Sequence, residues 1–415
     1  MHHFQYKGND LYCEDMAIEN IAKEVGTPFY LYSKETLEHH FKVFDNAFSD
    51  VPHITCYAVK ANSNIAILDI FGRLGGGADI VSGGELFRAL RAGMSPGKIV
   101  YSGVGKKIEE IDFALKSGIL MFNIESSQEL EVINQRAEKL GKKARISIRI
   151  NPDVDPKTHP YISTGLKKSK FGIDIKKALN EYRKARELKN IEVVGVDCHI
   201  GSQITEIGPF KDAVRKIKEL VVTLTSEGFA IKYLDLGGGL GIPYNAEEPP
   251  LPLEYARTII EEVRGLGCTL ILEPGRLLVG NAGILVTKVL YTKDTEEKSF
   301  VIVDAGMNDL IRPSIYGSFH FIQPVKKEER PNTMVDVVGP VCESGDFLAK
   351  ERQMPEARQG ELLAVMSGGA YGFAMASNYN SRPRVAEVLV QGDRYHIIRK
   401  RETFEDLIRL EEIPE

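Results

Sequence analysis

The sequence predicts an α/β protein in which a TIM (β/α)8 barrel is joined to a C-terminal all-β domain. From about residue 54 to 275, short β-branched apolar runs alternate with longer helical patterns. After Gly283, short apolar runs follow one another without long helices between them. The 415 residues also exceed the roughly 100 to 200 of one domain. We expect a barrel domain over 34–280 and a β domain built from 1–33 and 281–415.

Eight apolar runs have the composition of barrel strands. They lie at about 54–59, 78–81, 99–101, 119–124, 145–150, 192–198, 232–236 and 269–273. Their composition predicts burial on both faces, which is typical of a parallel sheet covered by helices. Helical patterns such as 84–92 and 210–217 separate them. A doubly wound sheet is the alternative, but such a sheet rarely has so many strands with connections so even.

The remainder of the chain predicts the second domain. Short strands are expected at 284–292, 300–303, 334–338, 362–366 and 385–390. Two N-terminal runs, 4–6 and 29–32, also have strand character and could join either domain.

Composition excludes several classes of function. Hydrophobic residues make up 43% and charged residues 27%, and the net charge of −5 is spread without a basic stripe, so nucleic-acid binding is not indicated. No apolar stretch reaches membrane-spanning length and the first residues lack signal-peptide features, which predicts a cytoplasmic protein. The five cysteines are scattered without a CxxC pair, so neither a disulfide framework nor a zinc site is expected.

Lys60 follows the first predicted strand. A lysine there could be an ordinary surface residue, or it could form a Schiff base with an aldehyde cofactor. Apolar neighbours would lower its pKa and free the amine lone pair.

Other reactive side chains follow the other predicted strands. Because the carboxyl ends of barrel strands meet at one mouth, these groups are expected to converge there. They are Asp79, Ser102, Glu125, Arg149, Asn151, His199, Ser202, Gly237, Gly238, Gly239, Glu273 and Arg276.

The glycine-rich segment 235–241 is suited to an anion, because glycines let backbone N–H groups approach it closely. Ser202 could add a hydroxyl to the same phosphate. A dinucleotide fingerprint is the alternative, but no first βα unit carries it. Glu273 could keep a pyridine nitrogen protonated, or it could form a buried ion pair with Arg276. His199 could stack on a flat ring or could be a core histidine, and no second ligand at zinc spacing accompanies it.

Loops of the second domain carry a further group of candidates. Cys342 lies among acids and a glycine, which favours a functional, partly exposed thiol over a buried one. Arg312, Tyr316 and Tyr371 add a cation and two phenols, which indicates a substrate with carboxylates.

These motifs together resemble one known family. The segments are Tyr57-Ala58-Val59-Lys60-Ala61-Asn62, His199-Ile200-Gly201-Ser202-Gln203, Gly237-Gly238-Gly239, Glu273-Pro274-Gly275-Arg276 and Cys342-Glu343-Ser344-Gly345-Asp346. They are similar to those of the diaminopimelate decarboxylases, fold-type III pyridoxal-phosphate enzymes with an alanine-racemase-like barrel and a β domain. Residues 159–165 and 170–172 resemble the active-site loop of that family.

The resemblance implies roles for individual residues. Lys60 would hold pyridoxal 5'-phosphate, His199 would stack on its ring and Glu273 would pair with the ring nitrogen. The phosphate would be held by Ser202, Gly237, Gly238, Gly239, Gly275, Arg276 and Tyr371, with Asp79 and Arg149 supporting the ring. The substrate would be bound by Arg276, Arg312, Tyr316, Glu343 and Tyr371.

The resemblance also implies a reaction and an assembly. The reaction is decarboxylation of meso-2,6-diaminopimelate to L-lysine and CO2, the last step of lysine biosynthesis, with Cys342 donating the proton. Cys342 and Glu343 would come from the other subunit of a homodimer. The alternatives are an ornithine or arginine decarboxylase of the same fold and a non-catalytic homologue that acts as a regulatory binding protein. A racemase would need a second base, usually a tyrosine, in place of the thiol.

Overall fold

The computed structural model describes residues 2–156, 158–162, 164–165 and 169–414. By its internal contacts the chain divides into two compact units. The first contains residues 1–39, 243–246 and 278–415, and the second contains residues 40–242 and 247–277. Helix α2 (Lys34–Ala47) begins in the first unit and continues into the second.

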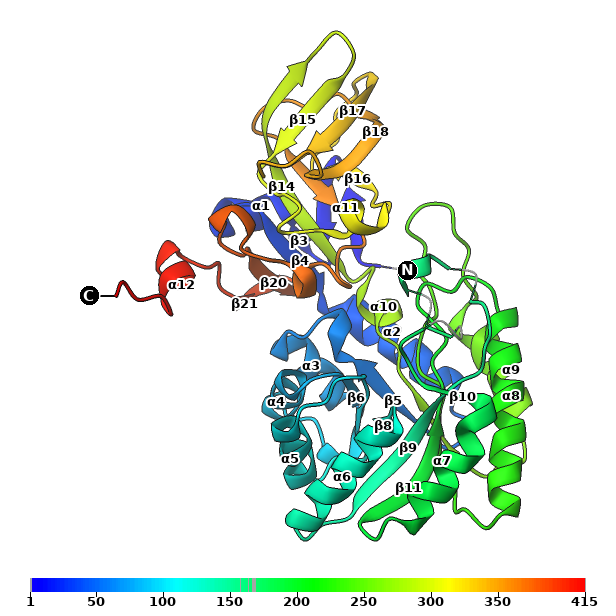
Figure 1. Ribbon diagram of the computed structural model, residues 1–415. Coiled ribbons are helices and arrows are strands. Elements are labelled where there is room, and N and C mark those ends of the chain that lie inside the picture. Colours follow the sequence, from blue (N-terminus) through cyan, green and yellow to red (C-terminus); the bar gives the residue numbers. More distant parts are fainter. Residues whose placement is uncertain (1, 157, 163, 166–168, 415) are drawn as a thin grey trace. The chain divides into compact units, whose positions relative to one another are not determined.

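The second unit is a closed parallel barrel (Figure 1). Among its described residues, eight strands follow the order β5, β6, β7, β8, β9, β11, β12, β13, and pairing of β13 with β5 closes the ring. Their bounds are β5 His53–Ala58, β6 Gly77–Ile80, β7 Ile99–Tyr101, β8 Met121–Ile124, β9 Ala144–Asn151, β11 Ile191–Asp197, β12 Tyr233–Asp235 and β13 Thr269–Leu272. The predicted barrel is therefore confirmed, and the closed ring excludes a doubly wound sheet.

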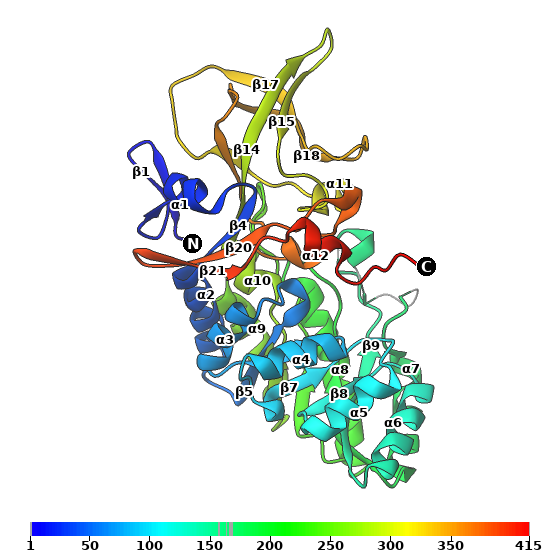
Figure 2. The same cartoon turned by 90° about the vertical axis from the view of Figure 1, so that its left-hand side faces the viewer.

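Helices surround the barrel strands, as Figure 2 shows for α4, α5 and α6. Their bounds are α3 Ile65–Arg73, α4 Gly83–Arg91, α5 Ile108–Ser117, α6 Ser127–Lys139, α7 Ile175–Glu187, α8 Gly208–Ser226 and α9 Pro252–Val263. The four-residue helix α10 Arg276–Val279 begins in the second unit and ends in the first. Polar residues at strand ends start several of them: the side chains of Asn64, Ser82 and Ser126 accept hydrogen bonds from the first turns of α3, α4 and α6. Short 3-10 turns, η1 Val59–Ala61, η2 Pro96–Lys98 and η3 Pro160–Ile162, and the short strand β10 Ile173–Asp174 complete the unit.

The first unit is built around a β-sheet with the order β18-β17-β15-β14-β4-β20-β21. The bounds are β4 Phe29–Ser33, β14 Gly283–Asp294, β15 Ser299–Val303, β17 Asn332–Val338, β18 Phe347–Pro355, β20 Ala386–Gln391 and β21 Arg394–Arg399, with β16 Ile322–Pro324 and β19 Leu362–Val365 off this path. A small sheet of β1 Phe4–Lys7, β2 Asp10–Cys13 and β3 Met16–Ala17 precedes α1 Ile18–Val25. The helices α11 Arg312–Tyr316 and α12 Phe404–Ile408 and the turns η4 Phe373–Met375 and η5 Tyr379–Ser381 follow later.

The structure decides where the N-terminal runs belong. Strand β4 pairs antiparallel with β14 and parallel with β20, so it lies inside the sheet of the first unit, and its residues are all buried. The apolar core around it includes Phe29, Leu31, Ile284, Val286 and Val388. No helix in the described part of the chain is both long and apolar enough to cross a membrane.

Candidate active site

Lys60 forms an ion pair with Asp79 at the mouth of the barrel. Strand β5 ends at Ala58, and Lys60 lies in the 3-10 turn η1 that follows it. Its Nζ is 2.5 Å from Oδ2 of Asp79, which lies opposite Ala58 on β6. The Asp79 side chain is fully buried, whereas about a third of the Lys60 side chain (35%) is exposed. The ion pair therefore holds the amine at the mouth, while part of it remains accessible to a ligand.

Arg149 lies at the end of β9 and is also paired with an acid. Its Nη1 donates to Oε1 of Glu125 at 2.8 Å, and its guanidinium lies 4.8 Å from the centre of the Phe171 ring. The other oxygen of Glu125 accepts the backbone N–H of Gly172 at 2.6 Å. The end of the predicted active-site loop is thus tied to the barrel mouth, although Ser163 and residues 166–168 of that segment lie outside the described residues.

His199 follows β11 with a defined tautomer. The backbone N–H of Gly238 donates to its Nδ1 at 3.2 Å, so this nitrogen carries no proton. Burial, together with the cations of Arg149 and Lys60, lowers the pKa of His199 well below 6.5. The imidazole is therefore neutral near pH 7, with its proton on Nε2.

The glycine run after β12 is closely packed against its neighbours. A methyl carbon on Gly238 would lie 2.1 Å from the carbonyl oxygen of Glu273, and one on Gly239 would lie 2.4 Å from that of Gly201. Gly239 also has a φ of 112°, which side chains rarely adopt. The loop can hold its backbone groups against the strand ends only because these positions lack side chains.

Glu273 ends β13 as a buried carboxyl group. Its Oε1 has no hydrogen-bond partner among the described residues. Burial raises its pKa well above 4.5, and the nearby carboxyl groups of Asp235, Asp79 and Asp197 raise it further. Burial therefore favours the protonated form of Glu273, which can offer a hydrogen bond.

Arg276 and Ser202 lie together at the same mouth. Arg276 is buried, and its Nη2 donates to Oγ of Ser202 at 3.0 Å. A methyl carbon on Gly275, just before it, would lie 3.0 Å from Cβ of Ala58 and 3.2 Å from Cβ of Ala61, so the last strand end packs closely on the turn that carries Lys60. The barrel residues that the sequence analysis predicted to converge thus lie at, or within a few residues of, the ends of parallel strands of one barrel, and their action as one site stays a prediction.

A polar network below the mouth was not predicted as functional. Asp197 and Asp235 lie opposite each other on β11 and β12, both buried. Asp235 accepts the N–H of Gly237 and an amide N–H of Asn123, each at 3.0 Å, and burial raises its pKa to about 6. Ser147 donates to the same Asn123 at 2.5 Å. The signal was present in the sequence, because these are polar residues inside otherwise apolar strand runs.

Arg312 and Tyr316, in the first unit, correct one expectation. They were predicted on a loop, but they begin and end the short helix α11. Pro313 at its start and Gly317, which ends it in a left-handed conformation, explain this helical turn. Arg312 is buried, and its Nη1 lies 2.8 Å from Nε2 of His320, a residue that the sequence analysis did not single out.

Cys342 and Glu343 lie on an exposed loop after β17, as expected for a functional thiol. The loop is held from three sides. The buried Asp346 accepts the N–H of Val341 at 2.6 Å, Ser314 of α11 donates to the carbonyl of Gly345 at 2.6 Å, and Asn380 accepts the N–H of Cys342 at 2.9 Å. Tyr371 is partly buried, with a φ of 57°. All of these residues belong to the first unit.

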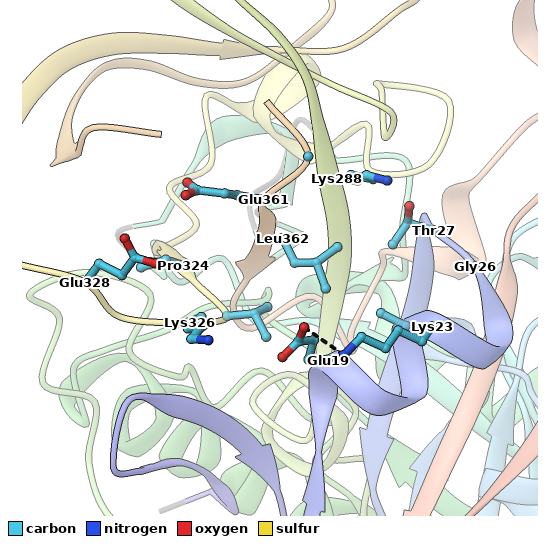
Figure 3. Close-up of a pocket in the computed structure, with 13 residues that line it drawn as sticks. Glu19, Lys23, Gly26, Thr27, Lys288, Pro324, Lys326, Glu328, Glu361 and Leu362 are labelled. Atoms are coloured by element: carbon cyan, nitrogen blue, oxygen red, sulfur yellow. Dashed lines mark ion pairs between the residues drawn. The ribbon is translucent and has the colours of Figure 1, made fainter. Parts of the chain in front are cut away.

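Figure 3 shows a separate cavity of about 590 Å³ in the first unit. Residues of α1, β16, β19 and their neighbours line it, and the ion pair of Glu19 with Lys23 (2.9 Å) lies at its edge. None of the predicted site residues is among those that line it.

Comparisons with known proteins show the family to which the chain belongs. A model of the pyridoxal-dependent decarboxylase family, for its pyridoxal binding domain, matches residues 34–280. A diaminopimelate decarboxylase of Aquifex aeolicus is 53% identical over 407 residues, which cover 98% of this chain and 96% of the relative.

Two solved structures of diaminopimelate decarboxylases, each in complex with L-lysine, also match. The one from Helicobacter pylori is 47% identical with a TM-score of 0.92, and the match covers 95% of this chain and 99% of that one. The one from M. jannaschii is 40% identical with a TM-score of 0.95, covering 99% and 98%. The chain therefore belongs to the diaminopimelate decarboxylase family of pyridoxal-dependent decarboxylases.

Proposed function

We propose that this chain removes one carboxylate of meso-2,6-diaminopimelate to form L-lysine and CO2, as the last step of lysine biosynthesis. The observation that carries the proposal is sequence identity to diaminopimelate decarboxylases over nearly the whole chain, which reaches 53% for the relative from Aquifex aeolicus. The L-lysine in two related structures supports it, because L-lysine is the expected product.

The barrel mouth fits pyridoxal 5'-phosphate. It offers an amine at Lys60, a buried Oε1 of Glu273 without a hydrogen-bond partner among the described residues, and a glycine run with no room for side chains. Bound there, the cofactor supplies an aldehyde for amines and an electron-accepting ring that eases the loss of a carboxylate.

The barrel residues divide the work of holding this cofactor. Lys60 supplies the amine for the aldehyde, and Asp79 keeps that amine in place before the cofactor binds. His199, because it is neutral, can lie against a flat ring without bringing a second cation beside Lys60. Glu273 presents its oxygen to the ring nitrogen, and Arg149 supports the ring side of the mouth. We assign the phosphate to Ser202, Gly237, Gly238, Gly239, Gly275, Arg276 and Tyr371.

We assign most of the groups that select and protonate the substrate to the first unit, with Arg276 as the barrel's contribution. Arg276 of the barrel and Arg312 bind carboxylate, and the other substrate contacts are assigned to Tyr316, Glu343 and Tyr371. The thiol of Cys342 donates the proton that replaces the lost carboxylate on the α-carbon.

We further propose that two copies of the chain share their active sites. Cys342 and Glu343 are exposed on the surface of the single chain, which is where residues that complete a partner's site would lie. Homodimerisation and a cytoplasmic location stay predictions. Sedimentation of the purified chain would test the first of them.

The decisive experiment compares CO2 release from meso-diaminopimelate, ornithine, arginine and lysine with the cofactor-loaded protein. We expect diaminopimelate to be strongly preferred, because Arg276 and Arg312 are assigned to the distal carboxylate, which ornithine, arginine and lysine lack. A preference for ornithine or arginine would overturn the substrate assignment. If the protein binds cofactor but releases CO2 from none of the four, the non-catalytic alternative holds.

A further inference from the structure

Two aromatic side chains hold the guanidinium of Arg312 in one orientation. Arg312 is 5% exposed, and its Cζ lies 4.6 Å from the centre of the Tyr244 ring. Its Nη1 lies 2.8 Å from Nε2 of His320. The rings of Tyr244 and His320 are themselves in edge contact, with centres 5.4 Å apart and planes at 77°. One ring therefore covers a face of the guanidinium, while the other contacts its edge.

The hydrogen-bond partners of His320 determine where its proton lies. Nδ1 is 2.8 Å from the carbonyl oxygen of Met366, which can only accept, so Nδ1 carries the hydrogen. A guanidinium can only donate, so Nε2 of His320 must be the unprotonated acceptor for Arg312. A neutral imidazole with its proton on Nδ1 satisfies both contacts, whereas a protonated ring would turn an N–H toward an N–H.

The backbone around His320 is equally well fixed. Its carbonyl accepts from Nη1 of Arg352 at 2.7 Å. The next residue, Phe321, accepts the N–H of Met366 at 2.8 Å, just before β16 pairs with β19. His320 is fully buried. The acceptor that it presents to Arg312 is therefore rigid.

We propose that His320 is a positioning residue that orients Arg312 toward the second carboxylate of the substrate. The inference rests on the assignment of Arg312 to that carboxylate in the proposed function. With one N–H held by His320 and one face covered by Tyr244, the other N–H groups of the guanidinium keep a constant direction. The conformational entropy of this long side chain is then lost when the protein folds and not when the substrate binds. The contact between Arg312 and the carboxylate therefore contributes more to the affinity for the substrate. Substrates that lack a second carboxylate gain no affinity from the fixed orientation of Arg312.

Two conservative substitutions separate this role from a purely structural one. In His320→Gln, the longer side chain places an amide oxygen near the position of Nε2 and keeps an acceptor for Arg312. In His320→Asn, the shorter side chain keeps an amide N–H near the position of Nδ1 for the Met366 carbonyl but loses the contact with Arg312. Each variant thus removes one of the two hydrogen bonds and retains the other.

We expect His320→Asn to raise KM for meso-diaminopimelate roughly tenfold with little change in kcat, and His320→Gln to stay within about threefold of the wild type. Thermal unfolding of both variants checks that they fold. If His320→Asn matches the wild type while His320→Gln is impaired, or if both raise KM equally, His320 only supports the fold and the proposal is wrong.

A second measurement does not depend on activity. ¹⁵N shifts of the imidazole, assigned by their loss in the His320 variants, should show a protonated Nδ1 and an unprotonated Nε2. A proton on Nε2 would overturn the proposal even in an active enzyme. If the wild type releases no CO2 from diaminopimelate but shows the expected tautomer, the proposed function fails and the orientation of Arg312 by His320 stands.

Discussion

The buried Asp309 makes the stability of the first unit depend on pH in an unusual direction. Its side chain is 1% exposed and accepts the N–H of Gly306 at 2.9 Å and an amide N–H of Asn308 at 3.0 Å. Burial raises its pKa from 3.8 to about 7, because the two hydrogen bonds only partly replace water. The folded carboxyl group thus holds its proton more tightly than the unfolded one. Folding takes up a proton between pH 4 and 7, so this group lowers stability as pH rises through that window.

The substitution Asp309→Asn removes this effect. The amide oxygen can keep the bond to Gly306, and Asn308, whose buried Oδ1 has no hydrogen-bond partner among the described residues, can turn to accept from the new amide. Taking the two pKa values of 3.8 and about 7, this group lowers the free energy of unfolding by about 4 kcal/mol above pH 8, where it is charged, and by about 1.7 kcal/mol at pH 5, where it must be protonated on folding. The variant should therefore gain about 2.5 kcal/mol on the wild type between pH 5 and 8.

Denaturant unfolding of both proteins at several pH values between 5 and 8 measures this difference. Asp406→Asn serves as a control, because bonds to Thr403 lower the pKa of that exposed acid and its removal should give no gain with rising pH. A constant difference between wild type and Asp309→Asn over the whole range would refute the reasoning, since it would mean that Asp309 is charged at pH 5.

Three further predictions concern the active site. Borohydride should fix the cofactor on Lys60, and Lys60→Ala should lose both this attachment and turnover; cofactor fixed elsewhere, by peptide mapping, would contradict the assignment. Cys342→Ala should keep cofactor absorbance but slow CO2 release roughly 100-fold or more, the usual contribution of a general acid, and unchanged turnover would remove the thiol from the mechanism. Gly238→Ala should cost about 1 to 3 kcal/mol of stability and weaken cofactor binding, because its methyl group would lie 2.1 Å from the Glu273 carbonyl oxygen. Gly105→Ala, with nothing within 4 Å, is the matched control, and equal effects of the two would refute the steric argument.

The strands that the sequence predicted well are those whose burial is uniform. The eight barrel strands lie within two residues of the predicted runs, because apolar β-branched residues are buried on both faces of each strand. The strands of the first unit that were not predicted include β18 and β21. They lie at the edges of the sheet and carry charged residues such as Lys350, Glu351 and Arg394, so their sequences resemble loops.

The barrel residues of the site could also be predicted, because their positions follow from the predicted strands. Parallel strands bring their carboxyl ends to one mouth, so the position of Lys60, His199 or Glu273 after a strand was enough to predict their convergence. The contacts of Arg312 could not be predicted from the sequence in this way. His320 and Tyr244 meet Arg312 through tertiary packing, and nothing in the local pattern around any of the three residues encodes the others.

By itself, the sequence determined the barrel, the residues at its mouth and the resemblance to one family of decarboxylases. Strand patterns and motif spacing are local properties of the sequence, so they can be recognised without a structure. Only the tertiary structure decided that the pKa of Glu273 is raised, that His199 is neutral and that one face of Arg312 is covered by Tyr244. The physical reason is that charge state and side-chain orientation depend on burial and on neighbours far apart in the chain.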